Sequence, residues 1–216
     1  MSIVRLIEDH VESLFENEGT GHDWYHIDRV RRNALHIQEK EGGDREIVEI
    51  AALLHDISDY KFNGGDDEKG GVVTREILKS HNYPADRIQL VVDIVNNVSF
   101  KGANTETNHM SLEGQIVQDA DRLDAIGAIG IARTFAYGGN VEQPIYDPKI
   151  DPSLHQTFEE YANSRTSTIN HFYEKLLLLK DRMNTKTGIE LASERHQVME
   201  TFLRSFYEEW NFNTVT

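Results

Sequence analysis

The sequence predicts an all-α fold on three observations. Apolar residues recur at intervals of three and four along most of the 216 residues, which is the spacing of one helix face. Only four prolines are present, and three of them fall in one stretch at Pro144, Pro148 and Pro152. No pair of strand patterns, internal repeat or low-complexity tract stands out. Helices can therefore form over most of the chain.

Apolar stripes locate the helices of the N-terminal half. They predict helices over about residues 3–14, 27–37, 47–54, 67–81 and 84–98. Asp44 is placed to cap the third helix, and Pro84 stands where the fifth can begin. Between Ile47 and Leu54 apolar residues occupy nearly every side, which is typical of the central helix of a bundle.

The C-terminal half predicts fewer, longer elements. One helix is expected over residues 112–137, and two long amphipathic helices over about residues 157–210. Polar loops are expected at 101–110 and, with the three clustered prolines, at 138–156. A loop as long as the second is often functional, so we expect it to help shape the mouth of the site.

Composition limits the class of function. Hydrophobic residues make up 38% and charged residues 27%, as in a globular domain, and the absence of cysteine excludes disulfides and thiol chemistry. The net charge of −15 disfavours nucleic acid and anionic membranes as partners. No apolar run reaches the ~20 residues of a membrane span, and the N-terminus lacks a secretory signal. We expect a cytoplasmic protein.

Residues that commonly bind metal ions lie on three of the apolar helices. His26 borders the stripe of the second helix, His55 and Asp56 end the third, and Asp121 lies within 112–137 with Asp119 as a rival. Burying two imidazoles and two carboxylates is costly, and a shared divalent cation removes that cost. Spacing alone also fits hydrogen-bonded core histidines and ordinary ion pairs.

The motifs around these residues resemble the HD-domain superfamily of metal-dependent phosphohydrolases. They read His-Asp-Trp-Tyr-His-Ile-Asp-Arg-Val, Ala-Leu-Leu-His-Asp-Ile-Ser-Asp and Asp-Ala-Asp-Arg-Leu-Asp-Ala-Ile-Gly. Later segments, Ala-Arg-Thr-Phe-Ala-Tyr-Gly-Gly and Met-Asn-Thr-Lys-Thr, look like the small bacterial YedJ/YpgQ-type subgroup. The resemblance implies one HD-type helical domain over residues 1–216. Its core motifs would span about 20–135, and the two C-terminal helices would pack on that bundle.

The same resemblance implies roles for particular residues. His26, His55, Asp56 and Asp121 match the family's metal ligands, and Asp59 matches a catalytic carboxylate of several members. Two nitrogens and two carboxylates suit one divalent ion, with Mn²⁺ favoured and Mg²⁺, Co²⁺, Fe²⁺ or Zn²⁺ also accommodated. Members with two metals carry extra histidines between the second and third motifs, where this chain has asparagines.

A phosphate substrate needs cations in so acidic a chain. Lys61 follows Asp59 by two residues, Lys101 follows the fifth helix, and Arg133 lies about three turns after Asp121 on the predicted helix. We expect these three residues to bind substrate, although each also fits a surface charge. Asp59 is expected to orient or deprotonate the attacking water.

The leading functional prediction is a metal-dependent phosphohydrolase that acts on soluble phosphate compounds. The resemblance favours nucleotides, cleaved by a nucleoside triphosphate pyrophosphohydrolase or a nucleotidase. The alternatives are a non-catalytic, metal-stabilised regulatory or binding module, and a phosphodiesterase. A nuclease conflicts with the acidic balance of the chain.

Overall fold

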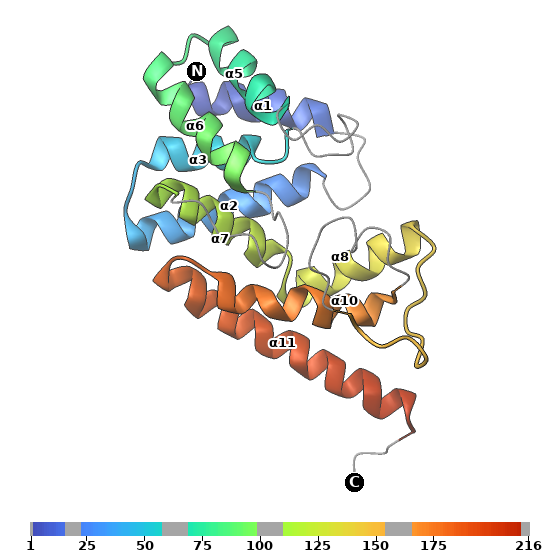
Figure 1. Ribbon diagram of the computed structural model, residues 1–216. Helices are drawn as coiled ribbons and strands as arrows, with labels where there is room; N and C mark the ends of the chain where they lie inside the picture. Colours follow the sequence, from blue (N-terminus) through green and yellow to red (C-terminus); the bar gives the residue numbers. More distant parts are fainter. Residues whose placement is uncertain (1, 16–22, 58–68, 99–109, 154–165, 213–216) are drawn as a thin grey trace. The chain divides into compact units, whose positions relative to one another are not determined.

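The computed structural model describes residues 2–15, 23–57, 69–98, 110–153 and 166–212. In these ranges the regular secondary structure is helical, and no β-strand is present, so the all-α prediction is confirmed (Figure 1). None of the helices in the described ranges is both long and apolar enough to cross a lipid bilayer. Contacts group the chain into two compact units, Met1–Lys101 with Glu106–Asp121, and Gly102–Thr105 with Arg122–Thr216.

The first unit is a bundle organised around one apolar helix. Its described helices are α1 (Ile3–Phe15), α2 (Trp24–Glu41), α3 (Arg45–Leu54), α5 (Lys69–Ser80), α6 (Ala85–Val98) and most of α7 (Leu112–Asp124). Seven of the ten residues of α3 are buried, and this helix contacts α1, α2 and α6. The predicted central helix is therefore confirmed, and its C-terminal end carries two of the candidate ligands.

Local signals set the ends of α2 and α3. Gly42 ends α2 with a φ of 87°, a backbone conformation that residues with a side chain rarely adopt. The Asp44 carboxylate then accepts hydrogen bonds from the backbone N–H groups of Glu46 at 3.0 Å and Ile47 at 3.2 Å. The cap predicted at Asp44 is confirmed, and it fixes where α3 starts and hence where it ends.

The second unit is built on one long helix. Its described helices are α8 (Gly127–Asn140), α10 (Thr168–Glu174), the 3₁₀ helix η1 (Leu176–Arg182) and α11 (Lys186–Trp210). The 25-residue α11 contacts α8 and η1. The ring of Phe172 is fully buried and stacks on Phe202 at a centroid distance of 5.7 Å.

The first of the two predicted C-terminal helices is less regular than the apolar spacing suggests. Residues 154–165 lie outside the described ranges, and the remainder consists of the short α10 followed by η1. Lys175, with φ −140° and ψ −58°, separates the two. The second predicted helix corresponds to α11.

The single helix predicted over residues 112–137 is wrong, because the structure divides it into α7 and α8. The break follows Asp124, and Gly127 has a φ of 75°, which favours glycine. A Cβ atom on Gly130 would lie 2.2 Å from the carbonyl oxygen of Ala125, so only glycine fits in the first turn of α8. Arg133 is therefore not on the helix that carries Asp121.

The proline-containing stretch is irregular over residues 141–153, as predicted, and α10 holds it in place. Backbone N–H groups of Thr168 and Ile169 donate to the carbonyls of Pro144 at 2.9 Å and Ile145 at 3.0 Å. The Asn170 side chain donates to the carbonyl of Ile150 at 2.8 Å. These bonds hold residues 144–150 in a defined conformation, and a role for the loop at the mouth of the site stays a prediction.

Candidate metal centre

Helix ends position the four predicted ligands. His26 is the third residue of α2, and Asp23 caps that helix by accepting a bond from the His26 backbone N–H at 2.8 Å. His55 and Asp56 directly follow the last residue of α3, and Asp121 lies in the last turn of α7. All four residues belong to the first unit.

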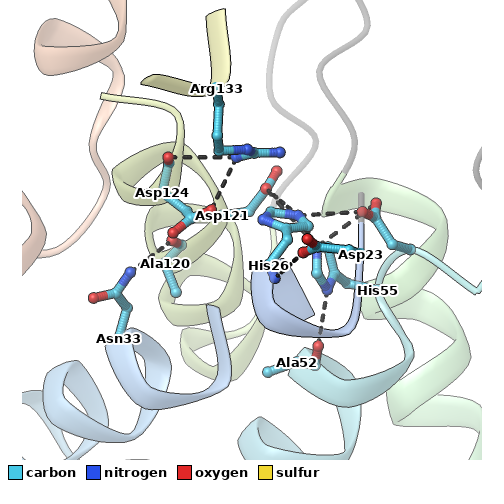
Figure 2. A network of polar contacts seen from close by, with 10 residues as sticks. Asp23, His26, Asn33, Ala52, His55, Ala120, Asp121, Asp124 and Arg133 are labelled. Carbon is cyan, nitrogen blue, oxygen red and sulfur yellow. Dashed lines mark hydrogen bonds and ion pairs between the residues drawn. The ribbon is translucent and has the colours of Figure 1, made fainter. Parts of the chain in front are cut away.

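The side chains of these residues converge. His26 Nε2 lies 3.3 Å from His55 Nε2 and 3.2 Å from Asp56 Oδ2. His55 Nε2 lies 3.6 Å from Asp56 Oδ1. Asp121 Oδ1 approaches both imidazoles, at 3.6 Å from His26 Nε2 and 3.8 Å from His55 Nε2. Figure 2 shows the two rings turned toward this shared space.

The backbone of α3 selects the tautomer of His55. His55 Nδ1 lies 2.8 Å from the carbonyl oxygen of Ala52. A carbonyl oxygen can only accept, so Nδ1 carries the hydrogen and donates it. In the neutral ring, Nε2 is then left with its lone pair directed at the cluster. This hydrogen bond behind the ring is the usual support of a metal-ligating histidine.

The spacing of the donor atoms fits one divalent ion. An ion about 2.1 Å from each donor places neighbouring donors roughly 3.0–3.4 Å apart, for octahedral or tetrahedral geometry. The measured separations of 3.2–3.8 Å are close to this range without any adjustment. Side chains of His26, His55 and Asp56 form a cluster that could hold a metal ion.

Burial differs between the nitrogen and the oxygen donors. The imidazoles are almost fully buried, with side-chain exposures of 1% for His26 and 2% for His55. Asp56 is 14% exposed and Asp121 is 31% exposed. The cluster is therefore closed on its histidine side and reaches solvent on its carboxylate side. A structural metal site is closed all round, whereas a catalytic site keeps an open position.

The structure brings Asp121 to the histidines. Asp119, the rival in the same motif, lies two residues earlier, about 200° around the helix, and is fully buried. A hydrogen bond from Asn33 Nδ2 to the Ala120 carbonyl, at 3.4 Å, joins α2 and α7 next to Asp121. The helices that carry His26 and Asp121 are thus linked beside the cluster.

Among the other predicted site residues, the structure describes Arg133 alone. Asp59, Lys61 and Lys101 lie outside the described residues. Arg133 lies on α8 in the second unit, where its Nη1 donates to Asp124 Oδ2 at 2.9 Å and to the Asp124 carbonyl at 3.3 Å. Whether these three cations bind substrate stays a prediction.

Sequence reasoning missed the groups that support the candidate ligands. Nothing in a sequence pattern marks the carbonyl of Ala52. Asp124 is conspicuous as a third acid in the last motif, and its burial at 1% exposure shows that it is not a surface charge.

Comparisons with known proteins agree with this fold and cluster. Residues 23–126 match the HD domain family, a range that contains all four candidate ligands. YpgQ of Bacillus subtilis, an uncharacterised protein, is 38% identical over 200 residues, which is 92% of this chain and 89% of YpgQ. The chain therefore belongs to the HD-domain family and, within it, to the YpgQ-type subgroup.

Solved structures extend the likeness over nearly the whole chain. A Lactobacillus plantarum protein matches with a TM-score of 0.85 and 38% identity, covering 99% of this chain and all of its own. An HD-superfamily hydrolase of Bacillus thuringiensis matches at 0.76 and 43%, covering 96% of each chain. The crystal structure of YpgQ in complex with ADP matches at 0.74 and 35%, covering 95% of this chain and 97% of YpgQ.

Proposed function

We propose that the chain is a divalent-metal-dependent phosphohydrolase that acts on soluble nucleotides, as a nucleoside triphosphate pyrophosphohydrolase or a nucleotidase. The observation that carries the proposal is the convergence of two imidazole Nε2 atoms and two carboxylates around one space that opens on the carboxylate side. Mn²⁺ is the favoured ion. When bound, such an ion polarises phosphorus and lowers the pKa of its water.

Each ligand has a separate task in this proposal. His55, fixed by the Ala52 carbonyl, and His26, fixed at the start of α2, form the rigid buried side of the site. Asp56 and Asp121 hold the side toward solvent, from which substrate approaches. Asp59 follows Asp56 by three residues and is proposed to take the proton of the attacking water.

Support for a nucleotide substrate comes from relatives. YpgQ was crystallised with ADP, and the B. thuringiensis relative is described as an HD-superfamily hydrolase. Phosphate groups require positive charge in a chain with a net charge of −15. The ion and the predicted cations Lys61, Lys101 and Arg133 would supply it.

The experiment is a turnover assay on a panel of ribo- and deoxyribonucleoside mono-, di- and triphosphates, together with cyclic nucleotides. The chain is first treated with a chelator and then supplied with Mn²⁺. We expect turnover of nucleotides only with the metal, and product analysis for pyrophosphate or orthophosphate identifies the bond that breaks. The same panel in Mg²⁺, Co²⁺ and Zn²⁺ ranks the metals.

Three results would overturn the proposal. Turnover that the chelator leaves unchanged would remove the metal from the chemistry. Stoichiometric metal binding with no turnover of any nucleotide would favour the alternative of a non-catalytic, metal-stabilised module. Turnover of a cyclic nucleotide alone would favour the phosphodiesterase.

A further inference from the structure

Two arginines from later helices hold the C-terminal turn of α7. Arg195 Nη1, on α11, donates to the Leu123 carbonyl at 2.5 Å, and this carbonyl also accepts from the Ile126 N–H at 3.3 Å. Arg133 Nη1, on α8, donates to the Asp124 carbonyl at 3.3 Å. The last carbonyls of a helix lack a full set of intrahelical donors. Guanidinium groups there satisfy these carbonyls and interact favourably with the helix dipole.

The corner between α7 and α8 is shaped around Arg195. Gly127 has a positive φ, and a Cβ atom there would lie 3.0 Å from Cβ and Cγ of Arg195. The hydrocarbon stem of the arginine therefore occupies the space that a side chain at residue 127 would take. Burial lowers the pKa of Arg195, and the nearby charge of Asp124 raises it. Arg195 is therefore packed into the corner between α7 and α8, and it is not an exposed surface charge.

This turn also contains Asp121, three residues before Asp124. Helix ends fray when their carbonyls lose partners. Fraying of the last turn of α7 would release the Asp121 carboxylate from its positions near His26 and His55. Metal affinity depends on such placement, because ligands must sit within a few tenths of an ångström of the ion's preferred distances.

We propose that Arg195 is a positioning residue for Asp121: its bond to the Leu123 carbonyl keeps the last turn of α7 helical and holds the Asp121 carboxylate at the histidines. The inference rests on the proposed function, because it takes Asp121 to be a metal ligand. It assigns a role at the candidate metal centre to a residue that lies 72 positions beyond Leu123 in the sequence.

The test compares Mn²⁺ affinities, measured by calorimetric titration of the chelator-treated full chain. Arg195→Met keeps the hydrocarbon stem and removes the donors, so we expect affinity to fall about tenfold or more, as when other supports of metal ligands are lost. Arg195→Lys, which keeps one cationic donor group, should recover part of that loss. Arg204→Met is the matched control on an exposed position of α11 and should stay within roughly twofold of the unaltered chain.

Double variants decide whether the effect passes through Asp121. Combined with Asp121→Asn, Arg195→Met should weaken Mn²⁺ binding no further, because the ligand that it positions is already gone. Combined with Asp56→Asn, on the other side of the cluster, the two losses should add. Thermal melting of each metal-free variant reports general damage to the fold separately.

The outcomes separate this inference from the proposed function. If Arg195→Met lowers only the melting temperature and leaves Mn²⁺ affinity unchanged, the arginine is structural and the inference is wrong. Equal further losses in the Asp121→Asn and Asp56→Asn backgrounds would also overturn it. If the unaltered chain binds no divalent ion, the proposed function fails first, and the inference fails with it.

Discussion

Asp121 and Asp124 lie one turn apart on α7 and meet different partners. Asp121 approaches the imidazole nitrogens of His26 and His55, whereas Asp124 bonds the guanidinium of Arg133. An arginine carries a permanent charge, so it neutralises its carboxylate within the protein. An imidazole nitrogen with a free lone pair is instead a common metal ligand. Asp121 therefore meets groups that commonly bind metal ions, whereas Asp124 is neutralised by an arginine of its own unit.

Histidines of the two units also differ in the groups that surround them. His26 and His55 face carboxylates, but burial and, to a smaller extent, the charge of Lys175 lower the pKa of His171 to about 3. A histidine that meets carboxylates is placed to share a cation. His171, in the second unit, is kept neutral and is half-buried. Burial of a polar residue is thus no sign of a site until its partners are known.

The largest expected effect is at the candidate metal cluster. Asp56→Ala should abolish stoichiometric Mn²⁺ binding and lower turnover by roughly 10³-fold or more, because it removes a ligand from a set of four. Metal analysis of the purified variant, together with nucleotide turnover, checks this. Asp9→Ala, at an exposed surface ion pair of α1, is the control. Undiminished metal content in Asp56→Ala would remove this residue from the site.

Substitution of Asp59 tests whether the candidate metal cluster takes part in catalysis or only binds an ion. If this residue takes the proton of the attacking water, Asp59→Asn should lower kcat by roughly 10²–10⁴-fold. Bound metal should remain, since the residue is not among the proposed ligands. Steady-state kinetics with a metal assay on the same sample provides both values. A loss of less than about tenfold would show that Asp59 is not the general base.

The Asp124 carboxylate, which pairs with Arg133, should contribute to the stability of the fold. Asp124→Asn removes the buried carboxylate charge that pairs with Arg133, so the free energy of unfolding should fall by about 3 kcal/mol. Asp28→Asn breaks the exposed pair with Arg32 and should cost less than about 1 kcal/mol. Urea unfolding of both variants measures the difference. Equal costs would mean that burial does not distinguish the two pairs.

The effect that is smallest per pH unit concerns His171. Its folded-state pKa of about 3 lies below the ordinary value of 6.5, so between these values the unfolded chain binds the extra proton. This contribution to stability is complete above about pH 6.5 and is lost as pH falls toward 3. Unfolding free energies of the unaltered chain should therefore decline more steeply than those of His171→Gln, by at most about 1.4 kcal/mol per pH unit. Parallel curves would place His171 in a more solvated setting.

The candidate cluster was predictable because its residues are chemically distinctive and stand in the order of the HD-domain motifs. His26, His55, Asp56 and Asp121 could be named in advance, and so could the apolar α3 that carries two of them. Asp44 was predictable as a cap for the same reason, since capping depends on residues that are neighbours in the sequence.

The features that could not be predicted from the sequence depend on backbone groups or on residues far apart in the chain. The Ala52 carbonyl that orients His55 has no side-chain signature, and Arg195 reaches Leu123 across 72 positions. The break between α7 and α8 was missed because apolar residues keep their helical spacing through both helices. Gly127 and Gly130 were visible, but only the neighbouring Arg195 and Ala125 explain why glycine is needed.

The most direct measurement is a crystal structure of the chain grown with MnCl₂, with anomalous diffraction recorded near the manganese absorption edge. The account predicts one anomalous peak per chain, bonded to Nε2 of His26 and His55 and to a carboxylate oxygen from each of Asp56 and Asp121. His55 should keep its hydrogen bond to the Ala52 carbonyl, and Arg195 its bond to the Leu123 carbonyl. No peak at these four residues, or a peak held by other side chains, would contradict it.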